Sequence, residues 1–161
     1  MITCTFENGK AAGLRHVVVD ILIVKKNSVL MECRAKHLVE GGKWALVGGF
    51  MDRDEHILDT VMREALEETG YRIRIVKLLY IADSIHRDAS NRQNVALVFV
   101  AYPEEKIGEP DEEVTKLQWF DFDHLPQKED IAFDHLHHIE QYLKSLQTNI
   151  PVIDISGRSS I

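Results

Sequence analysis

The sequence is poor in several features that mark particular protein classes. It contains only two cysteines, Cys4 and Cys33, which are too few and too irregularly placed for a disulfide framework or a zinc cluster. No apolar run approaches membrane-spanning length, and the first residues, MITCTFENGK, lack the charged and then apolar regions of a secretion signal. These absences predict a cytoplasmic protein without a membrane partner.

Basic residues are also scarce relative to acidic ones. The chain has 19 lysines and arginines against 26 aspartates and glutamates, which gives a formal net charge of -7. This balance argues against a nucleic-acid partner, because nucleic-acid-binding proteins present a basic face. It does not exclude a phosphorylated small molecule, because a bound metal ion reverses the local sign of the charge.

Apolar residues are abundant enough for a packed core. They make up 45% of 161 residues, so we expect one domain over residues 1–161, with a core of about 14–147 and a C-terminal tail at 148–161. The apolar patterns predict strands at 16–24, 29–34, 73–81, 94–102 and 114–120, a short apolar run at 44–47, and helices at 55–69 and 131–147. This order predicts an α/β sandwich with a mixed sheet.

Two polar segments connect the later predicted elements. Residues 83–93 join two strands, and residues 103–113, PEEKIGEPDEE, form an acidic stretch. One interpretation is that both are solvated loops, and the alternative is that they hold a substrate.

The helix predicted at 55–69 has recognisable ends. Asp54 is a residue type that caps a helix N-terminus, and Gly70 stands where a left-handed C-terminal cap is expected. Its apolar residues recur at helical spacing and predict one buried stripe. They are Ile57, Leu58, Val61, Met62, Ala65 and Leu66.

Three glutamates crowd one side of this helix. Successive helical residues are rotated by about 100°, so Glu64, Glu67 and Glu68 fall within an arc of roughly 100°. Mutual repulsion raises the free energy of carboxylates this close when all of them are ionised, so the group is expected to retain a proton or to bind a cation. Oxygen ligands suit hard cations, so we expect Mg²⁺, with Mn²⁺ as the alternative. Because Mg²⁺ favours phosphates as further ligands, the helix also predicts a phosphate-containing substrate.

Neighbouring residues are placed to support these glutamates. Arg63 is four residues before Glu67 and is expected to orient it through a charge-assisted hydrogen bond. Glu55, about two turns earlier, is expected to contact Arg63. The backbone of the Gly48–Gly49 pair is expected to approach a ligand closely and to offer carbonyl oxygens to a metal.

The simpler alternative is a solvated acidic helix face. Such a face would normally intersperse lysines, because like charges four residues apart destabilise a helix. The fixed spacing of seven specified residues is also improbable by chance. Both considerations favour a functional site.

The stretch GGFMDRDEHILDTVMREALEETGY, residues 48–71, resembles the Nudix box, G-x5-E-x7-R-E-U-x-E-E-x-G-U, where U is a bulky apolar residue. The matching residues are Gly49, Glu55, Arg63, Glu64, Glu67, Glu68 and Gly70. The resemblance implies an α/β/α sandwich that hydrolyses a nucleoside diphosphate linked to another group. It implies that Glu64, Glu67 and Glu68 bind the metals with the Gly48 carbonyl, and that Glu55 and Arg63 support them. Val47, Asp54 and Ala65 depart from common residues of the pattern, but none of these departures removes a metal ligand.

The reaction implied by this resemblance is attack of water at phosphorus, with Mg²⁺ neutralising the developing charge. A carboxylate would act as the general base. Glu64 is one candidate, and the others are Glu112 and Glu113, on the acidic segment where Nudix relatives often carry such a residue.

The wider sequence resembles ADP-ribose pyrophosphatase-like Nudix proteins in the segments WALVGGFMDRDE, QWF and IAFDH. This resemblance favours ADP-ribose as the substrate, with AMP and ribose 5-phosphate as products. The alternatives are a nucleoside triphosphate pyrophosphohydrolase, including one for oxidised nucleotides, and a non-catalytic module that binds nucleotide sugars. Arg34, Arg87 and Arg92 are candidate phosphate-binding residues. A homodimer would be consistent with the family.

The histidines near the second helix are a weaker signal. His135, His137 and His138 do not share one helical face, and no pattern of cysteines or carboxylates near them completes a zinc site. We therefore expect them to be solvated or to lie at the edge of the core.

Overall fold

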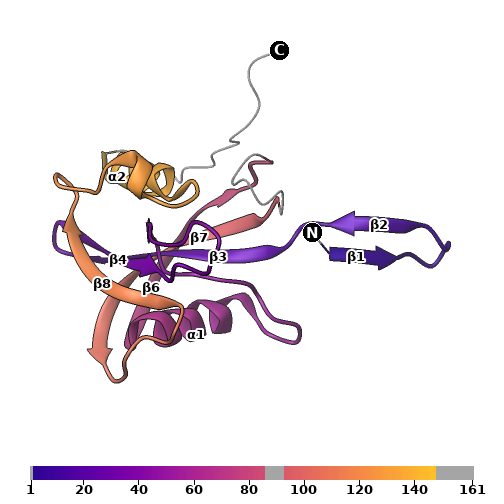
Figure 1. Ribbon diagram of the computed structural model, residues 1–161, viewed down its shortest axis with the longest axis horizontal. Coiled ribbons are helices and arrows are strands. Elements are labelled where there is room, and N and C mark those ends of the chain that lie inside the picture. Colours follow the sequence, from indigo (N-terminus) through magenta and orange to yellow (C-terminus); the bar gives the residue numbers. More distant parts are fainter. Residues whose placement is uncertain (1, 86–92, 148–161) are drawn as a thin grey trace, which may run out of the picture.

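The computed structural model describes residues 2–85 and 93–147, and a mixed β-sheet runs through its centre (Figure 1). The strands are β1 (Ile2–Thr5), β2 (Ala11–Leu14), β3 (Val17–Lys25), β4 (Ser28–Arg34), β5 (Trp44–Ala45), β6 (Tyr71–Ala82), β7 (Val95–Lys106) and β8 (Val114–Asp121). The helices are α1 (Ile57–Thr69), α2 (His135–Gln147) and a short 3-10 helix, Lys128–Asp130.

The main sheet has the order β5-β4-β3-β7-β6, with β8 paired to β4. β3 and β7 run parallel, while the other paired strands run antiparallel. Figure 1 shows α1 and α2 on opposite faces of the sheet. The expected α/β/α sandwich with a mixed sheet is confirmed.

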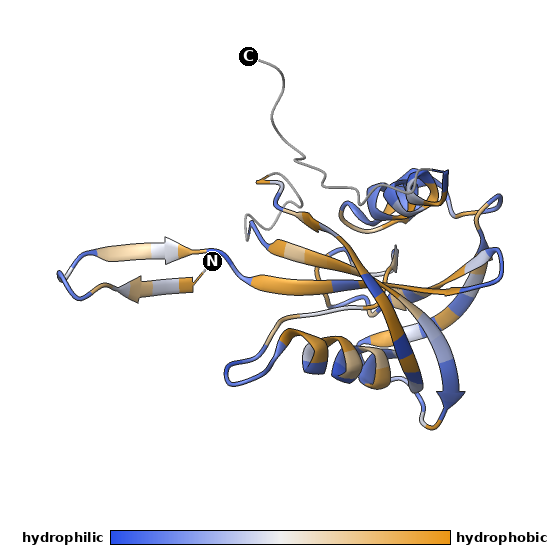
Figure 2. Ribbon diagram, turned by 180° about the vertical axis from the view of Figure 1, so that it is seen from behind, coloured by the Kyte–Doolittle hydropathy of each residue, from blue (hydrophilic) through white to orange (hydrophobic). Residues whose placement is uncertain are grey.

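β3 has the composition of a strand that is buried on both faces. Val18, Leu22 and Val24 belong to the core cluster that includes Ile139 of α2. The intervening Val19, Ile21 and Ile23 belong to a second cluster that includes Val61 of α1. Because successive strand residues point to opposite faces, one strand supplies both cores, and Figure 2 shows the hydrophobic colouring along it.

Both helices begin later than the sequence predicts. α1 begins after His56, and Asp54 lies in the preceding turn with a φ of 67°, so the prediction of Asp54 as the N-cap is wrong. The predicted cap at Gly70 is confirmed, with a φ of 71° and its N–H donating to the carbonyl of Leu66. α2 begins at His135 because Ile131 bridges to Trp44 and Phe133 adopts a φ of 55°, which interrupts a helix.

The apolar stripe of α1 is only partly buried. Val61 and Ala65 are fully buried, but Leu58, Met62 and Leu66 are exposed. The buried face of α1 is rotated toward Glu64 and Glu68, which lie against the sheet. The face of α1 that is buried therefore includes two glutamates in place of Leu58, Met62 and Leu66, which the apolar spacing alone predicted to be buried.

Two further differences concern the number and the extent of the strands. The β1–β2 hairpin was not predicted, and it projects away from the rest of the protein (Figure 1). β7 continues to Lys106, so the first residues of the predicted acidic loop are strand.

Arg87, Arg92 and the predicted tail at 148–161 lie outside the described residues. No helix in the described part of the chain is long and apolar enough to cross a membrane.

Candidate active site

The glutamates of α1 lie against the turn that precedes the helix. Glu64 and Glu68 are buried, with 8% and 4% exposure, while Glu67 is exposed. The Gly48 N–H donates to Oε2 of Glu68 at 2.8 Å. A Cβ atom at Gly49 would lie 2.4 Å from Oε1 of Glu64, so any larger residue would displace the Glu64 carboxyl group from this position.

Arg63 joins the acidic residues into one network. Its Nε and Nη2 donate to the two carboxylate oxygens of Glu55 at 2.9 and 3.0 Å. Its Nη1 donates to Glu64 at 2.7 Å and to Glu67 at 3.0 Å. The hydrogen bond from Arg63 is the main reason why the pKa of Glu55 is lowered to about 2. The expected contacts from Arg63 to Glu67 and Glu55 are therefore present.

Glu32 of β4 is an acidic residue of this site that sequence reasoning missed. It is 1% exposed, and its side chain is hydrogen-bonded to that of Glu68, so the two carboxyl groups share a proton. Burial raises its pKa to about 8, although Arg34, with Nη1 3.4 Å from Oε1, opposes the shift. Burial and the nearby Glu32 charge raise the pKa of Glu68 well above its ordinary value. The only available signal was a charged residue directly after the apolar run VLM, inside a predicted strand.

A cleft of about 230 Å³ opens over these groups. Its walls include Arg63 and the three glutamates of α1, the turn residues Gly48, Gly49, Phe50 and Asp52, and Arg34, Asp111 and Glu113. The structure thus brings the predicted residues Arg34 and Glu113 to the cleft. Glu112 is not among the lining residues, whereas Asp111, which was not predicted, is. The Asp111 N–H donates to the Glu67 carbonyl at 2.9 Å, which attaches this loop to α1.

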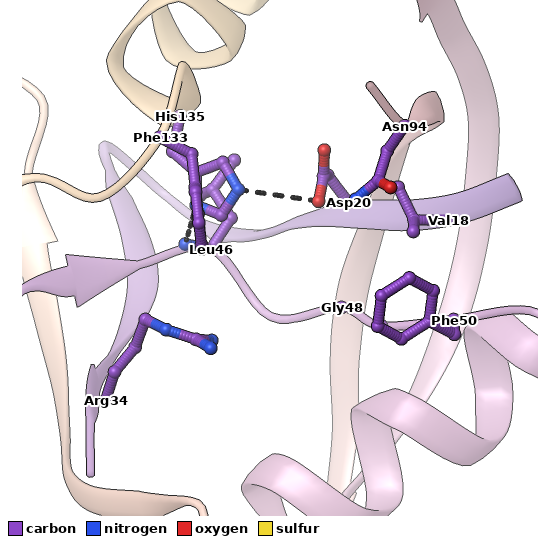
Figure 3. A pocket seen from close by; sticks show the side chains of 10 residues that line it. Val18, Asp20, Arg34, Leu46, Gly48, Phe50, Asn94, Phe133 and His135 are labelled. Atoms are coloured by element: carbon purple, nitrogen blue, oxygen red, sulfur yellow. Dashed lines mark hydrogen bonds and ion pairs between the residues drawn. The ribbon is translucent and has the colours of Figure 1, made fainter. Parts of the chain in front are cut away.

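A second cavity, of about 70 Å³, adjoins the cleft (Figure 3). Arg34, Gly48, Gly49 and Phe50 line both spaces. The remaining walls of the second cavity are Val18, Asp20, Leu46, Asn94, Phe133 and His135. A molecule with a phosphate end in the cleft would therefore have its other end next to this cavity.

Two of the histidines lie in a buried cluster beside the second cavity. The polar atoms of Asp20, Asp134, His135 and His138 lie within 4.8 Å of one another. The expectation that these histidines are solvated or lie at the edge of the core is therefore wrong for His135 and His138, which are 3% and 0% exposed. Asp20 was missed because it comes from β3, more than a hundred residues away in sequence.

Hydrogen bonds show how this cluster is organised. The Leu46 N–H donates to Nδ1 of His135 at 2.8 Å, so in the neutral ring Nε2 carries the hydrogen, 3.4 Å from Oδ1 of Asp20. Nε2 of His138 lies 3.0 Å from Oδ2 of Asp20, and its Nδ1 lies 2.5 Å from the Tyr80 hydroxyl. Because Nε2 of His135 carries a hydrogen, it offers no lone pair to a metal, and we interpret the cluster as a hydrogen-bonded network that holds the Asp20 carboxylate.

Comparison with known proteins identifies the family. The family model described as NUDIX domain matches residues 14–142. The chain belongs to the NUDIX family.

Individual relatives agree with this membership. The Nudix chain is 34% identical over 131 residues to a protein of Methanocaldococcus jannaschii named ADP-ribose pyrophosphatase, covering 80% of this chain and 73% of the relative. Family and relative together show that it is a Nudix pyrophosphohydrolase.

Solved structures show the same fold. A NUDIX hydrolase from Nitrosomonas europaea superposes with a TM-score of 0.72 at 23% identity, covering 95% of this chain and 90% of that one. The NUDIX domain of NrtR from Shewanella oneidensis, solved with ADP ribose, superposes with a TM-score of 0.66 at 26% identity. The match covers 84% of this chain and 90% of that domain's chain.

Proposed function

We propose that this Nudix enzyme hydrolyses the pyrophosphate bond of ADP-ribose and releases AMP and ribose 5-phosphate. The observation that carries this proposal is the 34% identity to the ADP-ribose pyrophosphatase of M. jannaschii. The related NUDIX domain solved with ADP ribose supports it. The geometry agrees, because an acidic cleft for a metal-bound diphosphate adjoins a second cavity for another part of the substrate.

The proposed cofactor is Mg²⁺, which Mn²⁺ could replace. Glu64, Glu67 and Glu68 would hold the metal together with the Gly48 carbonyl. The residues fit a hard cation because the donors are carboxylate oxygens, two of them on buried side chains. The buried Glu32 carboxyl group beside Glu68 adds negative charge that a bound cation would neutralise.

The protein side of the reaction follows from the network around Arg63. When bound, the metal would supply positive charge to the diphosphate and lower the pKa of a water molecule. Arg63, held by both oxygens of Glu55, would fix Glu64 and Glu67 in their orientations. Glu64 or Glu113, which both line the cleft, would accept the proton from the attacking water. Arg34, at the junction of the two cavities, would contact a phosphate.

The test is hydrolysis of a nucleotide panel with Mg²⁺, with product identification by chromatography. We expect AMP and ribose 5-phosphate from ADP-ribose, and no products in EDTA. Nucleoside monophosphate and pyrophosphate from a triphosphate, without turnover of ADP-ribose, would replace this proposal with the triphosphate alternative. Tight binding of ADP-ribose without turnover of any panel member would indicate a binding module.

A further inference from the structure

The second cavity contains a buried polar atom that the fold does not satisfy. Asn94 immediately precedes β7 and is 8% exposed, and its Oδ1 has no hydrogen-bond partner. Buried polar groups without a partner are rare in folded proteins, so each of them calls for an explanation. Because Asn94 lines the cavity, a ligand there would supply the missing partner.

Asp20 places a second acceptor on the same wall. β3 and β7 are parallel neighbours, and Asp20 is paired with Val98 in their register. Asp20 alternates with Val18 and Leu22 of the core cluster on the α2 side, and Asn94 alternates with Ala96 and Val98 of that cluster. Both side chains therefore point to the same face of the sheet, and Figure 3 shows them at the cavity.

The position of Asp20 is tightly constrained. His135 and His138 contact its two oxygens at 3.4 and 3.0 Å. These histidines are in turn held by Leu46 and Tyr80. A carboxylate held in this way is a preorganised acceptor for N–H groups.

Aromatic rings flank this polar wall. Phe50 and Phe133 line the cavity, and Phe50 also contacts the ring of His16, with centroids 5.0 Å apart. A cavity of about 70 Å³ accepts the edge of a flat ring and leaves the remainder at the opening. Aromatic walls with a few polar groups are typical of sites for nucleobases.

We propose that this cavity binds the amino edge of the adenine base, with the N6 amino group donating to Oδ1 of Asn94 and to the Asp20 carboxylate. The inference rests on the proposed function, since it assumes that the substrate is an adenine nucleotide. Two acceptors on one wall suit a nitrogen that carries two hydrogens. Hypoxanthine has a carbonyl oxygen at this position, which would face the Asp20 carboxylate without a hydrogen between them and would require the Asn94 amide to turn its Nδ2 toward the base. Asn94 and Asp20 would therefore be specificity-determining residues.

The first measurement compares kcat/KM for ADP-ribose with that for IDP-ribose, its hypoxanthine analogue. We expect the wild-type protein to prefer ADP-ribose by at least about tenfold, the effect of losing one to two hydrogen bonds to a buried site. Asn94→Ala should lower kcat/KM for ADP-ribose by about tenfold and leave that for IDP-ribose nearly unchanged. Asn27→Ala, an exposed asparagine in the β3–β4 turn, is the matched control and should keep the wild-type preference.

The second measurement is calorimetric binding of AMP and IMP, which does not depend on turnover. Equal kcat/KM values for ADP-ribose and IDP-ribose in the wild-type protein would overturn the base assignment, while the proposed function would stand. If neither compound is hydrolysed, the proposed function fails, and binding then decides about the cavity. Preference for AMP that Asn94→Ala abolishes would support it, and equal binding of AMP and IMP would overturn it. If Asn94→Ala does not fold, the wild-type comparisons alone decide.

Discussion

Replacing Gly49 by alanine tests whether the position of the Glu64 carboxyl group controls activity. The added Cβ would lie 2.4 Å from Oε1 and 2.5 Å from Cδ of Glu64. To restore an ordinary contact the carboxyl group must move by about 1 Å, and a displacement of that size costs on the order of 10²-fold in rate. The same movement would weaken the 2.7 Å contact between Arg63 and Glu64. We therefore expect kcat/KM for ADP-ribose to fall by about 10²-fold.

The fold should tolerate this substitution. The clashing atoms belong to the end of a side chain that faces the cleft, and Gly49 does not adopt a positive φ. We expect Gly49→Ala to melt within a few degrees of the wild-type protein. Gly48→Ala is different, because its Cβ would lie 2.0 Å from the backbone oxygen of Val19 at a φ of 152°. That variant should be strongly destabilised.

The assay pairs activity with metal binding. Gly108→Ala is the matched control, because a Cβ at Gly108 meets only the Cα of Gly70 at 3.7 Å. Mn²⁺ binding, followed by electron paramagnetic resonance, should weaken in Gly49→Ala and stay at the wild-type level in Gly108→Ala. If both alanine variants show wild-type activity and Mn²⁺ affinity, the position of Glu64 does not matter and the reasoning is refuted.

Three further predictions concern the charged groups around the cleft. Glu68→Gln should retain the fold, because the amide oxygen still accepts the Gly48 N–H, but should lose about 10²-fold in kcat/KM. The control is Glu129→Gln, at an exposed position. Unchanged Mg²⁺ dependence in Glu68→Gln would contradict the proposal that Glu68 binds the metal. The Glu32 pKa of about 8 exceeds its ordinary 4.5, so the folded metal-free protein keeps a proton that the unfolded chain releases. Its stability should therefore fall as the pH rises from about 4.5 to about 8, and urea unfolding in EDTA should show a smaller fall for Glu32→Gln. A fall of equal size in both proteins would contradict that pKa. Arg63→Lys cannot reproduce the two-pronged contact with Glu55 and should lower kcat/KM about tenfold, whereas wild-type kinetics would show that charge alone suffices.

Predictions from the sequence succeeded where the relevant pattern is local. The strands β3 and β4, the cap at Gly70 and the contact of Arg63 with Glu67 all follow from residues a few positions apart. The predicted start of α1 was wrong because residue type alone does not show the backbone conformation of the turn before the helix. Asp54 and His56 both precede the helix, and only the left-handed turn at Asp54 shows that the helix has not yet begun.

Groups that meet across the sheet could not be found in the same way. Glu32 lies behind Glu68 because β4 packs beside the turn that α1 follows, and its sequence context is an ordinary apolar strand. Asp111 rather than Glu112 lines the cleft because the loop is tied to α1 through a backbone hydrogen bond. A run of acidic residues does not indicate which of its members points inward.

The sequence by itself determined the family and the reaction class, because glycine, arginine and four glutamates stand at the fixed spacing of the Nudix box in and before one helix. Only the tertiary structure decided what surrounds that site. Asp20, Asn94 and His135 belong to three segments far apart in the chain, and they line one cavity because β3 and β7 are adjacent and α2 crosses the same face. Long-range packing of this kind leaves no periodic signal in the sequence, because nothing in the residues next to Asp20, Asn94 or His135 indicates that the three side chains meet.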